Sequence, residues 1–292
     1  MITAVDVVLA LVAALLFALG TVLQQKAGID EPSEGAGASL LIRMAQRPVW
    51  IAGIAADALG FVAQAAALGL GRLAVVQPVL VSSVAFALPL GVWLTRQRIR
   101  PMDVGAALLV VGALVVFLVI ANPSGGRDDA PFGDWLIAGG ACGLVSAVLI
   151  LLARFGSPPR RAALLGIATG ILFALSAALT KAVVDELDDR ILDVIAGWHL
   201  YALIVVGYIS MTLNQLALNQ GALAPAIATS MAFDPIASVV LGVTLLDESL
   251  HTTALGTAAT LVALVAALAG MAILARTQSQ TATKPLSAPA TA

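Results

Sequence analysis

The sequence is short of charged residues, of cysteine and of net charge, and each shortage excludes a class of protein. Charged residues make up 11% of its 292 residues and hydrophobic residues 60%, which excludes a soluble globular domain of this length. The net charge of -2 at pH 7 favours neither nucleic acid nor an acidic partner. The one cysteine, Cys142, lies in an apolar run and has no partner for a disulfide or a Cys-rich metal site, so we expect it to serve packing.

Motifs that carry chemistry are also missing. The sequence has no Walker motif, no nucleophile-elbow sequence and no metal-binding spacing of His or Cys. Its two histidines, His199 and His251, lie beside Trp198 and Leu250 near an expected membrane boundary. We therefore expect no cofactor, no direct use of ATP and no enzymatic activity.

What the sequence has instead is a series of long apolar runs. The hydrocarbon core of a bilayer, ~30 Å thick, requires about 20 apolar residues in helical conformation. Windows of that length fall at 5–24, 49–69, 73–94, 104–121, 135–153, 162–180, 197–218, 223–245 and 254–275. The sequence therefore predicts an all-α, polytopic membrane bundle of nine transmembrane helices. Because Asp6 rather than a basic residue precedes the first run, we expect that run to be a retained span and not a cleaved signal peptide.

The basic residues predict how the bundle is oriented. Eleven of the 15 lie on one side of the predicted spans, which is typical of the cytoplasmic side. These are Lys26, Arg43, Arg47, Arg96, Arg98, Arg100, Arg154, Arg160, Arg161, Arg276 and Lys284, and the other four are Arg72, Arg127, Lys181 and Arg190. We expect a cell (plasma or inner) membrane protein with its N-terminus outside, its C-terminus in the cytoplasm and a disordered tail over 277–292.

The second half of the chain resembles a diverged copy of the first. "LLFALGTVLQQKA" at 15–27 returns as "ILFALSAALTKA" at 171–182, and "GRLAVVQPVLVSS" from Gly71 corresponds to "GALAPAIATSMAF" from Gly221. Because the copies begin five spans apart, they are predicted to be inverted in the membrane. The expected organisation is a first repeat over 1–132 (spans 1–4), a connector with span 5 over 133–161, and a second repeat over 162–276 (spans 6–9).

Two acidic residues, Asp57 and Asp234, are predicted to lie near the middle of the bilayer. An ionisable group at this depth costs about 2.5 to 3.5 kcal/mol on insertion scales and normally faces the bundle interior. Asp57 shares a helical face with Gln64, and Asp234 shares one with Ser230 and Ser238. We expect both carboxylates to face one cavity and bind a solute, as metal ligands if it is a cation. The alternative is that each hydrogen-bonds a neighbouring helix.

Other polar groups extend the candidate site. Pro78 and Pro235 are predicted to break or bend spans 3 and 8, freeing a carbonyl for a cation and gating the path, with packing as the alternative. Gln77 adjoins Pro78 as a further candidate ligand. Span 7 carries a polar stripe that either binds solute or consists of interfacial tyrosine and interhelical amide bonds: Tyr201, Tyr208, Thr212, Gln215 and Asn219.

Two lysines, Lys26 and Lys181, end the first spans of the two repeats at opposite membrane surfaces. They either extend to the interface or gate the pathway and neutralise an anionic solute.

These features together resemble the drug/metabolite transporter superfamily and, within it, the EamA/NIPA-like branch known for magnesium transport. The residues that carry the resemblance are "FALGTVLQQKAG" in the first span, Trp50 with Gly53, Gly60 and Gln64, "VVQP" ending at Pro78, the turn from Arg96 to Asp103, and "LALNQGAL" at 216–223. The resemblance implies a helical bundle with a solute path between two repeats. The chain departs from it at Phe61, where NIPA-like proteins tend to have a glutamate, and at Phe17, where small multidrug exporters carry one.

The sequence thus predicts a secondary transporter that moves a small solute by alternating access, provisionally a cation such as Mg²⁺. A proton-coupled exporter of small organic metabolites or drugs is the alternative, and lipid-linked sugars are a third solute class. An intramembrane aspartyl protease is disfavoured, because "AADAL" and "AFDPI" lack the Gly-x-Gly-Asp pattern. The expected partners are the lipid bilayer and the solute, without nucleic acid, and the sequence leaves open whether the bundle works alone or as a homodimer.

Overall fold

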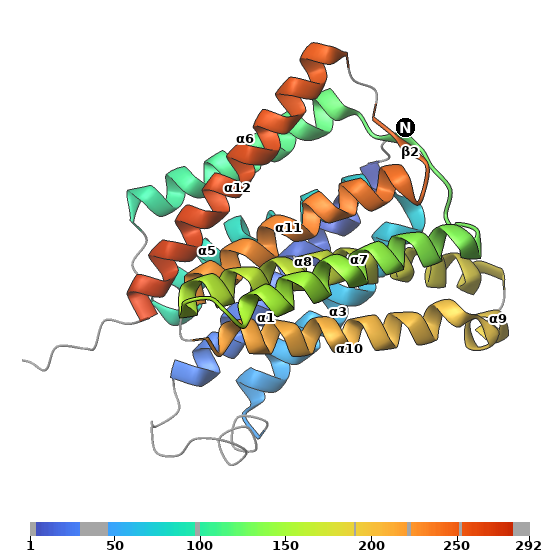
Figure 1. Ribbon diagram of the computed structural model, residues 1–292. Helices are drawn as coiled ribbons and strands as arrows, with labels where there is room; N and C mark the ends of the chain where they lie inside the picture. The colour runs from blue at the N-terminus through green and yellow to red at the C-terminus, as the bar shows by residue number, and fades with distance from the viewer. Residues whose placement is uncertain are drawn as a thin grey trace, which may run out of the picture.

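The computed structural model describes residues 4–29, 46–96, 100–189, 191–220, 223–250 and 253–282, and nearly all of them are helical (Figure 1). The helices are α1 (Ala4–Ile29), α3 (Pro48–Leu70), α4 (Leu73–Leu80), α5 (Ser83–Thr95), α6 (Pro101–Ala121), α7 (Phe132–Ala153), α8 (Pro158–Asp189), α9 (Ile191–Ala196), α10 (Trp198–Leu218), α11 (Leu223–Thr244) and α12 (Ala254–Ala282). Two short strands, β1 (Ser124–Gly125) and β2 (Glu248–Ser249), complete the fold.

Within these described ranges the chain forms nine helical spans long and apolar enough to cross a membrane. The prediction of an all-α, multi-pass membrane bundle is therefore confirmed. Helices are the expected form of such runs, because lipid offers no partner for backbone N–H and C=O groups and a helix satisfies them internally. Proline at the first helical position starts α3 at Pro48 and α6 at Pro101, where its missing N–H is not needed.

Some span limits differ from those predicted. The third span is divided into α4 and α5 by a turn at Val81 and Ser82. Helix α12 extends to Ala282, beyond the expected start of the tail at 277, because the sequence between them contains neither glycine nor proline to stop the helix. The rest of the predicted tail, 283–292, lies outside the described residues.

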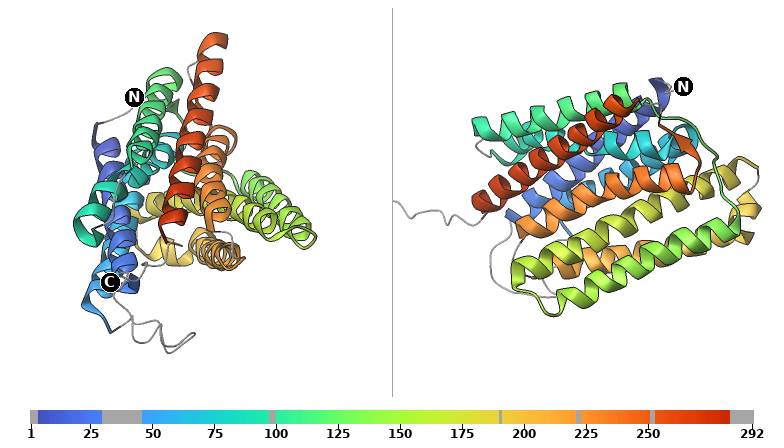
Figure 2. Two further views of the ribbon diagram at one scale, coloured as in Figure 1. Left: turned by 90° about the vertical axis from the view of Figure 1, so that its left-hand side faces the viewer. Right: turned by 45° about the horizontal axis from the view of Figure 1, so that its top comes forward.

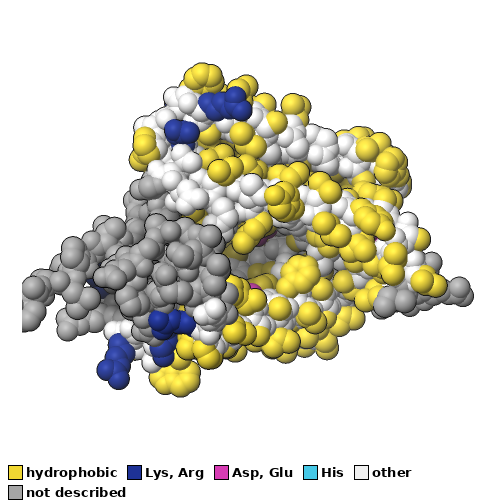
Figure 3. Space-filling model, turned by 90° about the horizontal axis from the view of Figure 1, so that it is seen from below, with side chains coloured by type: hydrophobic (Ala, Val, Ile, Leu, Met, Phe, Trp, Pro, Cys, Tyr) yellow, Lys and Arg dark blue, Asp and Glu magenta, His cyan; other side chains and the backbone are white. Residues whose placement is uncertain are grey.

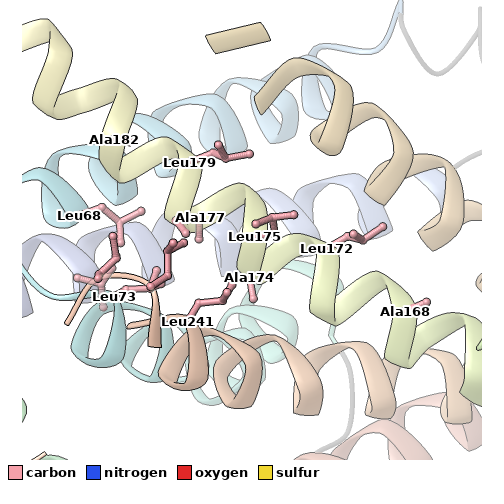
Figure 4. Packing of buried hydrophobic residues seen from close by; sticks show 14 of the residues in the cluster. Leu68, Leu73, Ala168, Leu172, Ala174, Leu175, Ala177, Leu179, Ala182 and Leu241 are labelled. Carbon is pink, nitrogen blue, oxygen red and sulfur yellow. The ribbon is translucent and has the colours of Figure 1, made fainter. Parts of the chain in front are cut away.

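Helix α8 forms the centre of the bundle. It packs against α3, α4, α7, α10 and α11, and 67% of its most apolar window is buried, the largest share among the described spans. Its leucines and alanines meet Leu68 of α3, Leu73 of α4 and Leu241 of α11 in one apolar cluster (Figure 4). Burial of such side chains contributes about 25 cal/mol per Å² where water is the alternative, whereas in lipid close packing is the main gain.

The remaining spans flank this centre. Helices α6 and α12 lie side by side on one flank, and α7 and α10 lie on the other, where both pack against α8 (Figure 2). Helix α1 packs against α3, α4 and α5. The flanking helices α7 and α10 are the least buried spans, at 11% and 17%.

A close helix contact joins α8 to α11 through Gly166 and Gly170. A methyl group on Gly170 would lie 2.6 Å from the Ser230 carbonyl oxygen and 2.8 Å from the Asp234 amide nitrogen. A methyl on Gly166 would lie 2.5 Å from the Ala226 carbonyl oxygen. These glycines therefore let two backbones touch, and their partner is another helix of the same chain.

A short strap ties two loops together at one end of the bundle. Strands β1 and β2 are antiparallel, with Ser124 opposite Ser249 and Gly125 opposite Glu248. They join the loop between α6 and α7 to the loop between α11 and α12. We call this the strap end; it also contains the α3–α4 turn, since Arg72 Nε donates a hydrogen bond to the Gly125 carbonyl at 2.9 Å.

Replacing Gly170 by alanine should destabilise the protein by about 1 to 3 kcal/mol, because the methyl group meets backbone atoms of α11 that cannot rotate away. The matched control is Gly143→Ala in α7, where no heavy atom lies within 4 Å of the new methyl. This control should be neutral or stabilising by up to about 1 kcal/mol, since alanine favours helix over glycine. Thermal unfolding of the purified protein in detergent measures both, and equal midpoints would contradict the packing described.

Candidate functional site

The mid-span carboxylate Asp57 lies on α3 and faces α1. Gln24 Nε2 donates a hydrogen bond to its Oδ2 at 2.5 Å. A methyl group on Gly20 would overlap the Asp57 carboxylate, so that glycine leaves the space the carboxylate occupies. Asp57 is half-buried, as is Gln64 farther along α3, whereas Phe61 between them is 48% exposed. The half-buried carboxylate thus packs against α1, with the Gln24 amide on one oxygen and Gly20 beside the other.

The second mid-span carboxylate, Asp234, lies on α11 where that helix crosses α8. Ser238 Oγ lies 3.4 Å from its Oδ1, a long hydrogen bond, and Ser230 Oγ donates instead to the Ile227 carbonyl at 3.2 Å. Ser230 and Ser238 are buried. Helix α11 continues through Pro235 without a break, and the bend expected at this proline stays a prediction.

The two carboxylates belong to helices that share neighbours. Both α3 and α11 pack against α8 and α4. Figure 3 shows a hollow on the face seen from below, with acidic atoms inside it and hydrophobic side chains around it. Among the described residues no group of three or more His, Cys, Asp or Glu side chains is arranged to hold a metal ion. A common chamber for Asp57 and Asp234 therefore stays a prediction.

The divided third span brings two unpartnered polar groups into the core. Gln77 and Ser82 are 3% and 7% exposed, and Gln77 Nε2 and Ser82 Oγ have no hydrogen-bond partner among the described residues. Gln77 precedes Pro78 inside α4, and Ser82 lies in the turn that ends this helix. Buried polar atoms without partners are rare and mark places where water or a solute can bind.

The polar stripe of α10 lies on an exposed face. Tyr201, Tyr208, Thr212, Gln215 and Asn219 are all exposed, Tyr208 by 74%. Two of their hydroxyls bond backbone carbonyls, Tyr201 to Ile195 at 2.9 Å and Thr212 to Tyr208 at 2.8 Å. Among the described residues, no hydrogen bond joins the side chains of Gln215 or Asn219 to another helix, and solute binding by this stripe stays a prediction.

The two lysines predicted to end the first spans of the repeats differ in their surroundings, and Lys181 lies inside α8, which continues to Asp189. Lys26 is half-buried in the last turn of α1. Lys181 is 4% exposed, and its Nζ donates to the carbonyls of Leu68 at 3.0 Å and Gly71 at 2.9 Å and to Asp128 Oδ1 at 2.7 Å. Three acceptors of the protein therefore satisfy the ammonium of Lys181.

The strap end contains a polar cavity of about 230 Å³ beside Lys181. It is lined by Leu70, Gly71, Arg72, Gly125, Gly126, Arg127, Asp128, Lys181 and Glu248. Glu248 is 2% exposed and accepts hydrogen bonds from the amides of Leu73 at 2.7 Å and Ala74 at 2.9 Å. Burial raises the pKa of the Glu248 carboxyl, although the two amide donors and the charges of Lys181 and Arg72 lower it.

A cluster of charged and aromatic side chains surrounds His199 near this end of the bundle. His199, 4% exposed, has its Nδ1 2.6 Å from Glu186 Oε1 and its Nε2 3.2 Å from Asp129 Oδ1. Trp135 Nε1 donates to the same Asp129 oxygen at 2.8 Å, and the ring of Trp198 lies 4.0 Å from that of His199. The cluster connects the α6–α7 loop to α8 and α10, so His199 is a structural contact and not only an interface residue.

Sequence reasoning missed most of the strap end. Asp128, Asp129, Glu186 and Glu248 belong to acidic loop runs that are typical of a solvated surface. Only their alternation with Arg72, Arg127 and Lys181 on the sparsely basic side could have indicated a charge network there.

Removing the Gln24 amide should destabilise the protein, because Gln24→Leu leaves the half-buried Asp57 carboxylate without its donor. Hydrogen bonds to charged groups contribute about 1.5 to 3 kcal/mol. Gln25→Leu is the control, since Gln25 is exposed one position further along α1. The thermal midpoint in detergent should fall for the first variant alone, and a fall of equal size in both would count against this contact.

The chain is similar to a bacterial protein over most of its length. No family model matches it, and no solved structure does. It is 33% identical over 247 residues to an uncharacterized protein of Corynebacterium glutamicum, and the match covers 83% of this chain and 84% of that protein. Identity of this extent shows that the chain belongs to the same protein family as the Corynebacterium glutamicum protein.

Proposed function

We propose that this multi-pass membrane protein is a secondary transporter that moves a small solute by alternating access. The observation that carries the proposal is the pair of carboxylates at mid-span, Asp57 on α3 and Asp234 on α11. Placing an ionisable group at this depth costs about 2.5 to 3.5 kcal/mol, and such groups usually belong to solute or ion pathways.

The helix contacts support two inverted halves. Helix α1 packs against α3 and against α4 and α5, and α8 packs in the same way against α10 and α11. The last spans of the proposed halves, α6 and α12, pack against each other. The first half comprises spans 1–4, the second spans 6–9, and α7 is the connector. Rocking of such halves around a central site is a common way to alternate access.

The resemblance to the EamA/NIPA-like branch of the drug/metabolite transporter superfamily favours a cation, provisionally Mg²⁺. If two carboxylates bind a divalent ion, its uptake would need no energy source other than the membrane potential. A membrane potential of ~100 mV acting on two charges supplies about 4.6 kcal/mol, roughly a thousandfold accumulation. We further propose that the protein lies in the cell membrane with its N-terminus outside, so that the strap end faces outward.

Proton-coupled export of a small organic solute is a second candidate. The exposed aromatic rings of Phe61 and Tyr208 and the hydrophobic rim of the hollow in Figure 3 favour it. In that case the same two carboxylates would take up and release protons between the two states of the transporter.

Flux into proteoliposomes tests the proposal. Wild-type protein should admit Mg²⁺ when a potassium diffusion potential is imposed without a pH gradient, as reported by a trapped magnesium dye. Asp57→Asn and Asp234→Asn should each abolish this entry, because each removes one negative charge from the site. Asp185→Asn, which changes an exposed carboxylate near the end of α8, should keep the wild-type rate.

The outcomes separate the two solutes. Organic solute movement driven by a proton gradient alone, without magnesium entry, would replace the cation with the second candidate. Flux of either solute that persists in both asparagine variants would refute the role of the carboxylates.

A further inference from the structure

The α3–α4 turn at the strap end is held from two sides by charged groups of distant segments. Lys181 of α8 bonds the carbonyls of Leu68 and Gly71, at the C-terminal end of α3. Glu248 of β2 bonds the amides of Leu73 and Ala74, at the N-terminal end of α4. Each charge therefore meets the helix terminus of opposite partial charge.

We propose that Lys181 and Glu248 form a lock that keeps the strap end closed to solute and that must release when this end opens. The proposal rests on the alternating-access function proposed above. Both contacts join residues of the first half, 1–132, to residues of the second half, 162–276. Separation of the halves at this end cannot occur while both contacts stay intact.

The burial of the two charges gives the lock its strength. Lys181 and Glu248 are 4% and 2% exposed, and a buried charge that loses its partners suffers the full cost of desolvation. The adjoining cavity, of about 230 Å³, has room for the water that would hydrate both groups once they separate. Release of the lock would therefore replace the protein partners of both charges by water.

Two glycines leave room for the side chain of Glu248. A methyl group on Gly242 would overlap the Glu248 carboxylate, and a methyl on Gly126 would lie 2.9 Å from its Cγ. Gly126 also has a φ of 95°, a conformation that favours glycine. Both glycines thus leave space for the side chain of Glu248.

The strap adds a second connection between the same halves. Ser124 and Gly125 of the first half pair with Ser249 and Glu248 of the second. Arg127 Nε and Nη2 donate to the Leu245 carbonyl at 3.1 and 2.9 Å, and its Nε lies 3.2 Å from Asp247 Oδ2. The lock and the strap should therefore open together.

Hydrogen exchange of the purified full-length protein tests the lock without any solute. Lys181→Met and Glu248→Gln should each speed amide exchange over 70–76 and 245–250 by about tenfold or more, since each removes hydrogen bonds to a charged group. Lys26→Met, which changes the lysine at the matching place in the first repeat, should leave exchange at the strap end unchanged. Unchanged exchange in the first two variants, or an equal rise along α6 and α12, would overturn the lock.

A reversible crosslink tests whether the strap end must open during transport. In a Cys142→Ser background, Ser124→Cys and Ser249→Cys place two thiols opposite each other across the strap. Oxidation should stop flux into proteoliposomes, and reduction should restore it, whereas each single-cysteine variant should be insensitive to oxidant. Continued flux in the oxidised, crosslinked protein would overturn the lock and leave the proposed function intact. If wild type shows no flux but amide exchange rises in Lys181→Met and Glu248→Gln, the proposed function would be overturned. The two residues would still hold the strap end closed.

Discussion

Every polar group of this chain that enters lipid must find its partner inside the protein, and most of the structure depends on that constraint. The backbone meets it by forming helices over all nine described spans. The side chains meet it through individual hydrogen bonds. Gln24 donates one to Asp57, and carbonyl oxygens at the end of α3 accept two from Lys181. Gln77 Nε2 and Ser82 Oγ are among the buried polar atoms that lack a partner among the described residues, and both lie in the third span, which is divided into two helices.

Helix α8 connects the two polar regions of the molecule. At mid-span its Gly170 lies against the backbone at Asp234, and near its end Lys181 reaches the α3–α4 turn. A rigid helix that contacts both regions offers a physical route by which a change at the proposed solute site would alter the strap end. Its close backbone contact with α11 opposes sliding of these two helices past each other.

The sequence predicted the spans well because their signals are local: apolar length, basic residues at Arg47 and Arg100, and the prolines that follow them. It predicted the strap end poorly because those contacts are not local. The acceptors of Lys181 on α3 are main-chain carbonyls more than 100 positions away, which no side-chain pattern encodes. Helical periodicity likewise identified the polar face of α10. It could not show that this face is exposed, because periodicity does not determine which helix packs against a given face.

The central claim is that Asp57 and Asp234 face a common water-filled chamber between two inverted halves. Thiol accessibility tests it most directly, with Asp57→Cys and Asp234→Cys introduced separately into a Cys142→Ser background and treated with a charged, membrane-impermeant reagent. The account predicts that the reagent modifies the cysteine at both positions. Reaction of both cysteines only with lipid-soluble reagents would contradict it.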